Sequence, residues 1–315
     1  MEDEFFIKNY NNSSVSGLTM LGRIGNDLYW YYREGLDRRL IKTDENFSIQ
    51  WEVDFGSNNV RSILKSSISD DIFLVGDKSV LVSGSFERKL FLAKISPAGN
   101  VIWDKVHDIT ISEAYLNFGD YIQPFNSNQY ILRSFQTISI IDENGNIVAS
   151  RRRRISGRSD YYEIMGLETH NNQVFVLYKD PVFSSTNLGE LIILDSNLNF
   201  LRLFRLSGNP EGSLNETRLA KIGTKIYVSF NDVSFNVGII PLDVVTDLGT
   251  GSTSGSFTGQ RFTNSYSFEN LYPQQIFVHN NKIYLVGENE GTEAFPHRLV
   301  ISKLSENLSI EWIQK

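Results

Sequence analysis

Residues that could act as acids, bases or metal ligands are scattered along this chain rather than grouped in one motif. Glu168, Asp120 and Asp71 fall in or near predicted strands, and two carboxylates that a fold brings together can act as acid and base in glycoside cleavage. The histidines lack the His-x-His or His-Glu-x-x-His spacing of a metal site; they are His107, His170, His279 and His297. Because the carboxylates are scattered and the histidines lack the spacing of a metal site, the sequence favours a non-catalytic protein over an enzyme.

The run Asp142-Glu143-Asn144-Gly145-Asn146 shares its first residues with a calcium loop, but it lacks the bidentate glutamate that closes one. Asn144-Gly145 instead predicts a tight hairpin turn, because both central positions of such a turn need positive φ. The chain has no cysteine, which excludes disulfides, zinc–thiolate sites and thiol nucleophiles. It also lacks a Gly-x-Ser-x-Gly elbow and a phosphate-binding loop. We therefore predict no metal and no cofactor.

Four consecutive arginines, Arg151 to Arg154, form the one abrupt run of charge, and Arg158 follows closely. As a patch they could hold phosphate, sulfate or an acidic partner. At the end of an outer strand they could instead prevent edge-to-edge aggregation. Alternate side chains of an extended strand point in opposite directions, so the four cannot form one patch. We favour the second interpretation.

A segment of about 50 residues recurs along the chain and contains four short apolar runs. The clearest copies end in tryptophan and cover 40–51, 90–103 and 299–312, while 140–148 and 192–201 keep the turn and lose the tryptophan. The runs are rich in β-branched and aromatic residues and bounded by Asn, Gly, Asp and Ser, which predicts strands. Four short strands at this period are typical of one blade of a β-propeller.

Each copy of the repeat is preceded by a second predicted hairpin, which would supply the two inner strands of its blade. The predicted pairs are 72–75 with 80–83, 165–168 with 174–178, 219–222 with 225–230, and 275–279 with 282–287. The first unit then covers about 16–53 and the last about 271–315. The remaining run, 4–10, is expected to pair near the last blade and help to close a ring, which would remove an exposed sheet edge.

The repeat therefore predicts an all-β protein with a single domain over 1–315. The expected architecture is a six-bladed β-propeller of four-stranded antiparallel blades, with seven blades as the alternative. The units resemble bacterial β-propeller repeats of the tryptophan-docking and YVTN/PQQ-like type, in which a Gly-x-x-x-Trp segment ends each blade. Gly99 to Trp103 is the full copy, and the resemblance covers nearly the whole chain. The Ala-x-Asp-x-x-Thr-Gly core of quinoprotein blades is absent, so the resemblance implies no quinone.

Composition narrows the possible partners. The chain of 315 residues is 41% hydrophobic and 21% charged, with a net charge of −7, which weighs against general binding to nucleic acid or to anionic membranes. No apolar run is long enough for a membrane-spanning helix. The acidic start lacks the apolar core of a secretory signal, so we expect a cytoplasmic or particle-associated protein. Nothing in the composition indicates an oligomeric state.

Loop lengths suggest which face of the blades binds a partner. If the strands of a blade are named a to d from inside to outside, the a–b and c–d turns lie on one face, and the b–c and d–a loops lie on the other. The predicted d–a connections are long, for example 54–71, 107–119 and 151–160, and long ordered loops commonly carry function. The Gly/Ser/Thr-rich stretch 246–259 replaces a c–d turn and is expected to be a mobile excursion on the opposite face. The alternative is a docking strap that becomes ordered when a partner binds.

The d–a/b–c face is the predicted binding surface, because tyrosine, arginine and histidine combine contact area with hydrogen bonding. Its candidate residues are Arg158, Tyr161, Tyr162, Phe183, Arg261, Tyr266, Phe268, Tyr272, Phe295 and His297. Any one of these rings could instead fold its loop back over the blades. We expect a non-catalytic binding or assembly module that recognises a protein or a glycan. The alternatives are a carbohydrate-active enzyme with carboxylates at the central channel and a component of a phage-like or contractile injection particle.

Overall fold

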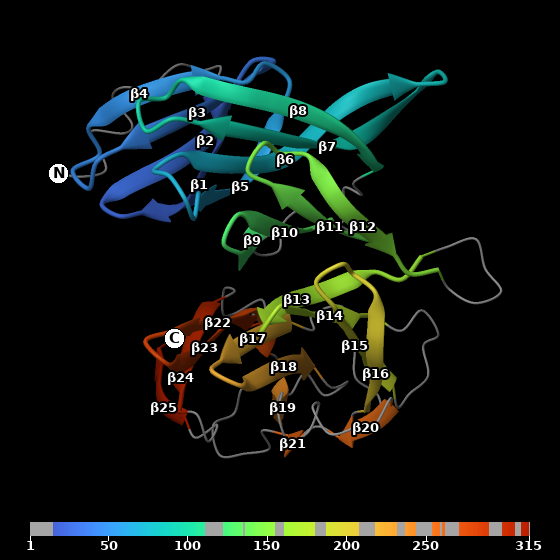
Figure 1. The fold of residues 1–315 in the computed structure, drawn as a ribbon. Helices are drawn as coiled ribbons and strands as arrows, with labels where there is room; N and C mark the ends of the chain where they lie inside the picture. The colour runs from blue at the N-terminus through green and yellow to red at the C-terminus, as the bar shows by residue number, and fades with distance from the viewer. Residues whose placement is uncertain are drawn as a thin grey trace. The chain divides into compact units, whose positions relative to one another are not determined.

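The chain is built of β-strands. The computed structural model describes residues 15–110, 122–134, 136–154, 161–179, 187–207, 218–231, 237–243, 254–258, 260–261, 271–289, 298–305 and 310–314. These residues form 25 strands, arranged in six sheets (Figure 1). They contain no helix long and apolar enough to cross a membrane. The chain divides into two compact units, Met1–Arg151 and Arg152–Lys315.

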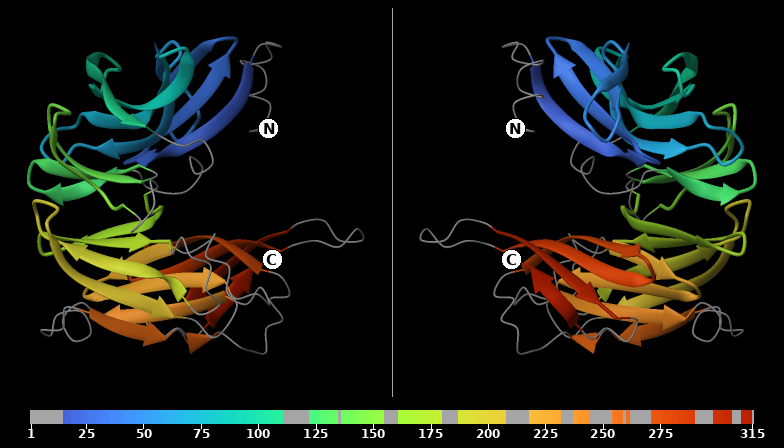
Figure 2. Two further views of the ribbon diagram at one scale, coloured as in Figure 1. Left: turned by 90° about the vertical axis from the view of Figure 1, so that its right-hand side faces the viewer. Right: turned by 90° about the vertical axis from the view of Figure 1, so that its left-hand side faces the viewer.

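The first unit contains three sheets, and in each the four strands are neighbours in chain order. The first sheet consists of β1 (Val15–Ile24), β2 (Asp27–Glu34), β3 (Asp37–Thr43) and β4 (Ile49–Asp54). The second consists of β5 (Asn59–Lys65), β6 (Ile72–Val82), β7 (Ser85–Ile95) and β8 (Val101–Thr110). The third consists of β9 (Ile122–Asn126), β10 (Gln129–Arg133), β11 (Thr137–Asp142) and β12 (Ile147–Arg152). Figure 2 shows the twist of these sheets.

The middle sheet of this unit is buried on both faces, which explains its continuous apolar runs. Alternate residues of a strand point to opposite faces. Leu74 accordingly packs in a core with Tyr29 and Leu40 of the first sheet. Its neighbour Phe73 packs in a second core with Tyr130 of the third sheet, and these two rings lie 4.4 Å apart. Burial of both faces stabilises the stack of sheets through the hydrophobic effect.

Tryptophans on the fourth strands dock on turns of the following sheet. Trp51 of β4 donates a hydrogen bond from Nε1 to the carbonyl of Pro97, at 2.9 Å. Its ring also lies against Gly99, where a Cβ atom would come within 2.9 Å of it. Trp103 of β8 occupies the same position against Gly145 of the turn between β11 and β12. Gly99 and Gly145 have φ of 85° and 70°, so both the turn conformation and the ring favour glycine.

The second unit also contains three sheets. The first consists of β13 (Ile164–His170), β14 (Gln173–Tyr178), β15 (Asn187–Leu194) and β16 (Phe200–Ser207), with β20 (Ser254–Thr258) at its edge. The next consists of β17 (Arg218–Ile222), β18 (Lys225–Asn231), β19 (Val237–Asp243) and β21 (Gln260–Arg261). The last consists of β22 (Leu271–His279), β23 (Lys282–Asn289), β24 (Arg298–Leu304) and β25 (Ile310–Gln314). Phe175, Phe204 and Val228 belong to a core shared by the first two.

The predicted fold class is confirmed, and the predicted number of four-stranded blades is wrong. Among the residues that the structure describes, five sheets are blades of four strands, rather than the six or seven expected. The remaining sheet has five strands, because β20 adds to β16 in parallel. The units predicted at 16–53 and 271–315 match β1 to β4 and β22 to β25. The run 4–10, expected to close a ring, lies outside the described residues.

One predicted hairpin is wrong, although those at 165–178, 219–230 and 275–287 are confirmed. Residues 72–83 are expected to form two strands with a turn at 76–79, but Ile72–Val82 is the single strand β6. Its first partner is β5, within the range 54–71 that is expected to be a loop. This short strand is difficult to recognise in the sequence, because apolar residues occur at only a few of its positions. Its polar residues are Asn59, Arg61, Ser62 and Lys65. Asp77 is tolerated within β6 because arginines neutralise it.

The Gly/Ser/Thr-rich stretch contains more structure than its composition predicts. Ser254–Thr258 forms β20, and Gln260–Arg261 forms β21, which pairs with β19. The expected mobile excursion over 246–259 is therefore wrong for 254–258, and the rest of that range lies outside the described residues. Backbone hydrogen bonds to an existing sheet edge supply order that the side chains alone do not favour.

Candidate interaction site

The hairpin of β6 and β7 extends beyond the rest of its sheet. β5 pairs with β6 only as far as Asp77, and β8 pairs with β7 only from Lys89 onward. The remaining pairs, from Ser79 with Arg88 to Val82 with Ser85, form a two-stranded projection (Figure 1). Ser83 and Gly84 close it with φ of 50° and 87°, as a two-residue hairpin loop requires. The projection is therefore a regular strand pair rather than an irregular loop.

The projection exposes two large apolar side chains that face each other across the strands. Leu81 and Phe86 are register partners, with 61% and 78% of their surface exposed. Alternation along the strands places them on the same hairpin face as Ser79 and Arg88. Leu36, on the turn between β2 and β3, is 87% exposed. Both turns connect second to third strands, so they belong to the b–c side on which the sequence predicts a binding surface.

A buried polar cluster fixes the base of the projection. Asp77 is fully buried, and its carboxylate pairs with Arg61 at 2.9 Å and with Arg88 at 3.5 Å. It also accepts a hydrogen bond from Asn59 at 2.8 Å. Leaving a buried carboxylate unpaired is strongly unfavourable, so these donors keep Asp77 within the sheet. The cluster anchors the hairpin at the point where its pairing with β5 and β8 ends.

Asn59 links this cluster to the first sheet. Its side-chain oxygen accepts hydrogen bonds from the Tyr31 hydroxyl at 2.9 Å and from Arg38 Nε at 3.0 Å. Burial raises the pKa of Tyr31, and the nearby arginines 38, 61 and 33 partly oppose that rise. Because Arg38 follows the turn that carries Leu36, the contact with Asn59 shows that the two b–c turns lie on the same side of their sheets.

Tyr161 and Tyr162, two of the predicted binding residues, lie against the arginine run. The Arg152 guanidinium is 5.6 Å from the centre of the Tyr161 ring, and that of Arg153 is 4.3 Å from the Tyr162 ring. Arg153 also pairs with Glu190. Arg151 and Arg153 are partly buried, whereas Arg152 and Arg154 are exposed. This alternation matches the expectation that the four arginines cannot form one patch.

Of the other predicted residues, the structure describes only two. Arg261 lies in β21 and Tyr272 in β22, and the backbone alone is described there. The remaining candidates lie outside the described residues: Arg158, Phe183, Tyr266, Phe268, Phe295 and His297. Sequence reasoning misses the hairpin bearing Leu81 and Phe86, because Gly76 to Ser79 resembles a turn. The Ser83-Gly84 pair between apolar runs is the signal that could locate the true turn.

The carboxylates considered for catalysis occupy other positions in the described structure. Glu168 lies on β13, as expected for a first strand. Asp71 precedes β6, a second strand, and not a first strand as expected. Asp120 lies outside the described residues. Within the described ranges, no group of three or more His, Asp or Glu side chains could hold a metal ion.

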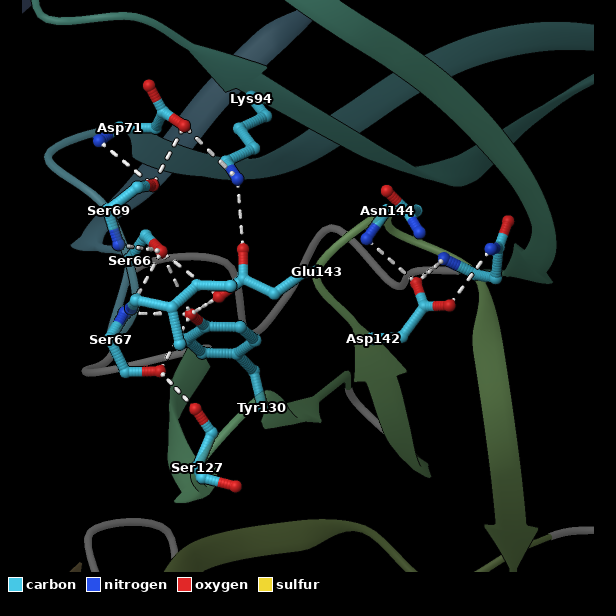
Figure 3. Close-up of polar contacts among 12 residues, drawn as sticks. Ser66, Ser67, Ser69, Asp71, Lys94, Ser127, Tyr130, Asp142, Glu143 and Asn144 are labelled. Atoms are coloured by element: carbon cyan, nitrogen blue, oxygen red, sulfur yellow. Dashed lines mark hydrogen bonds and ion pairs between the residues drawn. The ribbon is translucent and has the colours of Figure 1, made fainter.

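Asp71 belongs to a second polar cluster, which joins the β5–β8 sheet to the β9–β12 sheet (Figure 3). Lys94 Nζ lies 3.2 Å from Asp71 and 2.9 Å from Glu143. Burial alone would lower the pKa of Lys94, but the hydrogen bonds to Glu143 and Asp71 outweigh burial and raise it. The buried hydroxyl of Tyr130 donates to Glu143 and accepts from the Ser67 amide at 2.8 Å. Each charge in this cluster has a partner, so it acts as a structural junction.

Glu143 reaches this cluster from the hairpin turn whose sequence partly resembles a calcium loop. The Asp142 carboxylate accepts the backbone N–H groups of Asn144 at 2.9 Å and Asn146 at 2.8 Å. Asp195 accepts those of Asn197 and Asn199 in the same way, at 2.8 Å each. These bonds use the aspartate to stabilise the turn. The hairpin predicted at Asn144-Gly145 is confirmed, but its turn type is not, because only Gly145 of the two residues has positive φ.

Comparison with known proteins gives similarity of fold without similarity of sequence. No family model and no curated protein matches the chain. Prolyl oligopeptidase B from Galerina marginata is 10% identical, with a TM-score of 0.50, over 99% of this chain and 45% of that protein. A structure described in a study of two prolyl endopeptidases is 8% identical, with a TM-score of 0.50, over 95% of this chain and 41% of that one.

The WD40 domain of Neurospora crassa Pan2 is 11% identical, with a TM-score of 0.47, over 82% of this chain and 66% of that domain. The chain thus spans less than two thirds of each of these three proteins. No match supports the specific YVTN/PQQ-like family, although Trp51 and Trp103 do dock on neighbouring turns. At these identities the likeness concerns the fold alone. The strand order described above is that of an all-β fold made of β-propeller blades.

Proposed function

We propose that this chain is a non-catalytic module that binds a partner protein through the d–a/b–c side of its blades. The observation that carries the proposal is the β6–β7 projection, on which Leu81 and Phe86 stand side by side and exposed. Burial of such a side chain in a partner would contribute about 1.5–3 kcal/mol. The Asp77 cluster at its base holds the projection in place before binding, which reduces the entropic cost of association.

The pairing of an aliphatic with an aromatic side chain favours a protein partner over a glycan. An apolar pocket on a protein can enclose both Leu81 and Phe86, and aromatic anchors in pockets commonly dominate protein interfaces. A glycan would need hydrogen-bonding groups beside the ring. On the face that carries Phe86, the neighbouring register pair is Ser79 with Arg88, and Arg88 already pairs with Asp77. The proposed occupant is therefore an apolar pocket of another protein.

Site-specific photo-crosslinking tests this proposal in native lysate. A benzoylphenylalanine at position 86 is expected to form a defined adduct with one protein, whereas the same group at position 68 forms none. Ile68 is a matched control, because it is 61% exposed and lies on the connection between β5 and β6, at the other end of the sheet.

The protein identified in this way is then purified for affinity measurements. Replacing both Leu81 and Phe86 by serine is expected to raise its Kd at least 30-fold, while Ile68→Ser leaves Kd unchanged. An unchanged Kd for the double variant would contradict the proposal. Binding in a glycan screen that Phe86→Ser abolishes would replace it with the glycan alternative.

A further inference from the structure

The edge of β16 is covered by a strand that comes from the connection between two strands of the next sheet. β20 lies between β19 and β21 in the chain but pairs with β16, from Leu203 opposite Ser254 to Ser207 opposite Thr258. This pairing is parallel, whereas the register of β16 with β15 on its other edge is antiparallel. Figure 1 shows β20 beside β16. The edge of β16 therefore accepts an extended segment that is remote in sequence.

For a strand of five residues, β20 pairs only weakly with the edge of β16. Its sequence is Ser-Gly-Ser-Phe-Thr, and glycine and serine contribute little side-chain packing to a strand. Parallel pairing is also slightly less stable per residue than antiparallel pairing. β16 itself is firmly placed, because Phe204 and Leu206 are buried in the core. The edge is thus rigid and its cover exchangeable.

The side chains of β16 indicate which residues a strand would need in order to pair with this edge more stably than β20 does. The Arg205 side chain is 70% exposed and lies 3.9 Å from Glu190, which also pairs with Arg153. Such a distant, exposed ion pair contributes little stability. The register partner of Arg205 is Ser256, and partners in register lie on the same face of a sheet. A carboxylate at the position of Ser256 would therefore reach the Arg205 guanidinium.

We propose that the outer edge of β16 binds an extended peptide of a partner protein, and that β20 occupies this edge when the partner is absent. The peptide runs parallel to β16 and forms main-chain hydrogen bonds with it, as in strand addition to a sheet edge. It carries an acidic residue opposite Arg205 and a large apolar residue opposite Leu206, where the chain's own strand has Phe257. This edge involves other residues than the β6–β7 projection and does not depend on the function proposed for that projection.

A labelled peptide with the sequence of residues 252–260 tests the proposal, with valine at position 255 and glutamate at position 256. Its binding to the full chain is measured by fluorescence anisotropy. In an opened variant, Ser256→Pro and Phe257→Pro prevent β20 from pairing, because proline cannot donate a backbone hydrogen bond. The opened variant is expected to bind the peptide at least tenfold more tightly than the unaltered chain. The attached strand competes at an effective concentration in the millimolar range.

A charge exchange tests the predicted chemistry of the occupant. In the opened variant, Arg205→Glu is expected to weaken binding at least tenfold, and a peptide with lysine at position 256 is expected to restore it. Equal binding to the opened variant and to the unaltered chain would overturn the proposal, because the peptide would then bind elsewhere. Failure of the folded opened variant to bind would also overturn it.

An engineered disulfide between β16 and β20 gives a second measurement, which does not require the proline variant to fold. The chain has no cysteine, so Leu203→Cys with Ser254→Cys introduces a single pair at register partners. The reduced protein is expected to bind the peptide, and the oxidised protein at least tenfold less, because the disulfide holds β20 on the edge. Equal affinity in both redox states would contradict the exchange of strands.

Discussion

His107 on β8 has a ring nitrogen, Nε2, that is buried and makes no hydrogen bond within the described structure. Burial lowers its pKa below the ordinary value of 6.5, and a backbone hydrogen bond with Gly145 only partly opposes this. The unfolded chain therefore binds a proton at this residue more readily than the folded chain. Stability contributed by the neutral ring is complete above about pH 6.5 and is lost as the pH falls toward the lowered pKa.

We expect the free energy of unfolding of the unaltered chain to fall between pH 7.5 and pH 5.5, and His107→Gln to lose less over the same interval. Urea unfolding at both pH values measures the two slopes, and their difference removes the contribution of the other histidines. Parallel slopes for the two proteins would show that His107 titrates equally in the folded and unfolded states.

Gly145 illustrates how one missing side chain permits a contact between sheets. Alanine there would adopt a left-handed φ, at about 1–2 kcal/mol, and its Cβ would displace the ring of Trp103. Overpacking adds about 1–3 kcal/mol. We expect Gly145→Ala to lower the free energy of unfolding by about 2–5 kcal/mol in urea titrations.

Gly25 is a matched control for this change, because its φ is +64° and a Cβ added there would meet no other atom within 4 Å. Gly25→Ala is expected to cost only the backbone part, about 1–2 kcal/mol. Equal losses at the two positions would mean that Trp103 moves aside without cost. The difference between the two variants thus measures the docking of the tryptophan.

At the scale of the elements, the cluster around Glu143 joins a turn of one sheet to the strands of its neighbour. Glu143 accepts hydrogen bonds from Lys94 at 2.9 Å and Ser66 at 3.0 Å, and from Tyr130. Glu143→Gln retains the shape but leaves Lys94 with one carboxylate fewer. We expect a loss of about 1–3 kcal/mol in the free energy of unfolding.

Glu45 has the same place in the corresponding turn of the first sheet and is the matched control. It lies 3.8 Å from Arg23, and both side chains are mostly exposed. Glu45→Gln is expected to change stability by less than about 0.5 kcal/mol, because exposed ion pairs contribute little. If both variants lose the same amount in urea titrations, the burial of Glu143 has no special importance.

The strands show which elements a sequence can predict. The hairpin at 275–287 can be located because its apolar runs flank Asn280-Asn281, whose φ values of 49° and 54° suit asparagine. β5 escapes prediction, because its polar residues conceal a strand of seven residues. The extension of β6 past Asp77 depends on partners from β5 and β7, which the local sequence does not reveal.

For the whole molecule, the repeat is sufficient for the fold class because each four-stranded meander is formed by neighbouring segments. The pairing of β20 with β16 joins residues about 50 positions apart and has no local signal. The candidate site is predicted less well. Sequence places it on the b–c side, but cannot show that Tyr162 packs on Arg153 or that Phe86 has no cover. What a ring packs against is decided by the fold and not by its neighbours in the chain.

The docked tryptophans allow the contacts between neighbouring sheets to be followed by intrinsic fluorescence. The chain has four tryptophans, and Trp51 and Trp103 each rest on a turn of the adjoining sheet. Detachment of one sheet from the next would hydrate these indoles while the strands themselves stayed paired. Intrinsic emission would then shift to longer wavelength before the β-signal in circular dichroism declined, so stepwise opening of the stack would register without any added label.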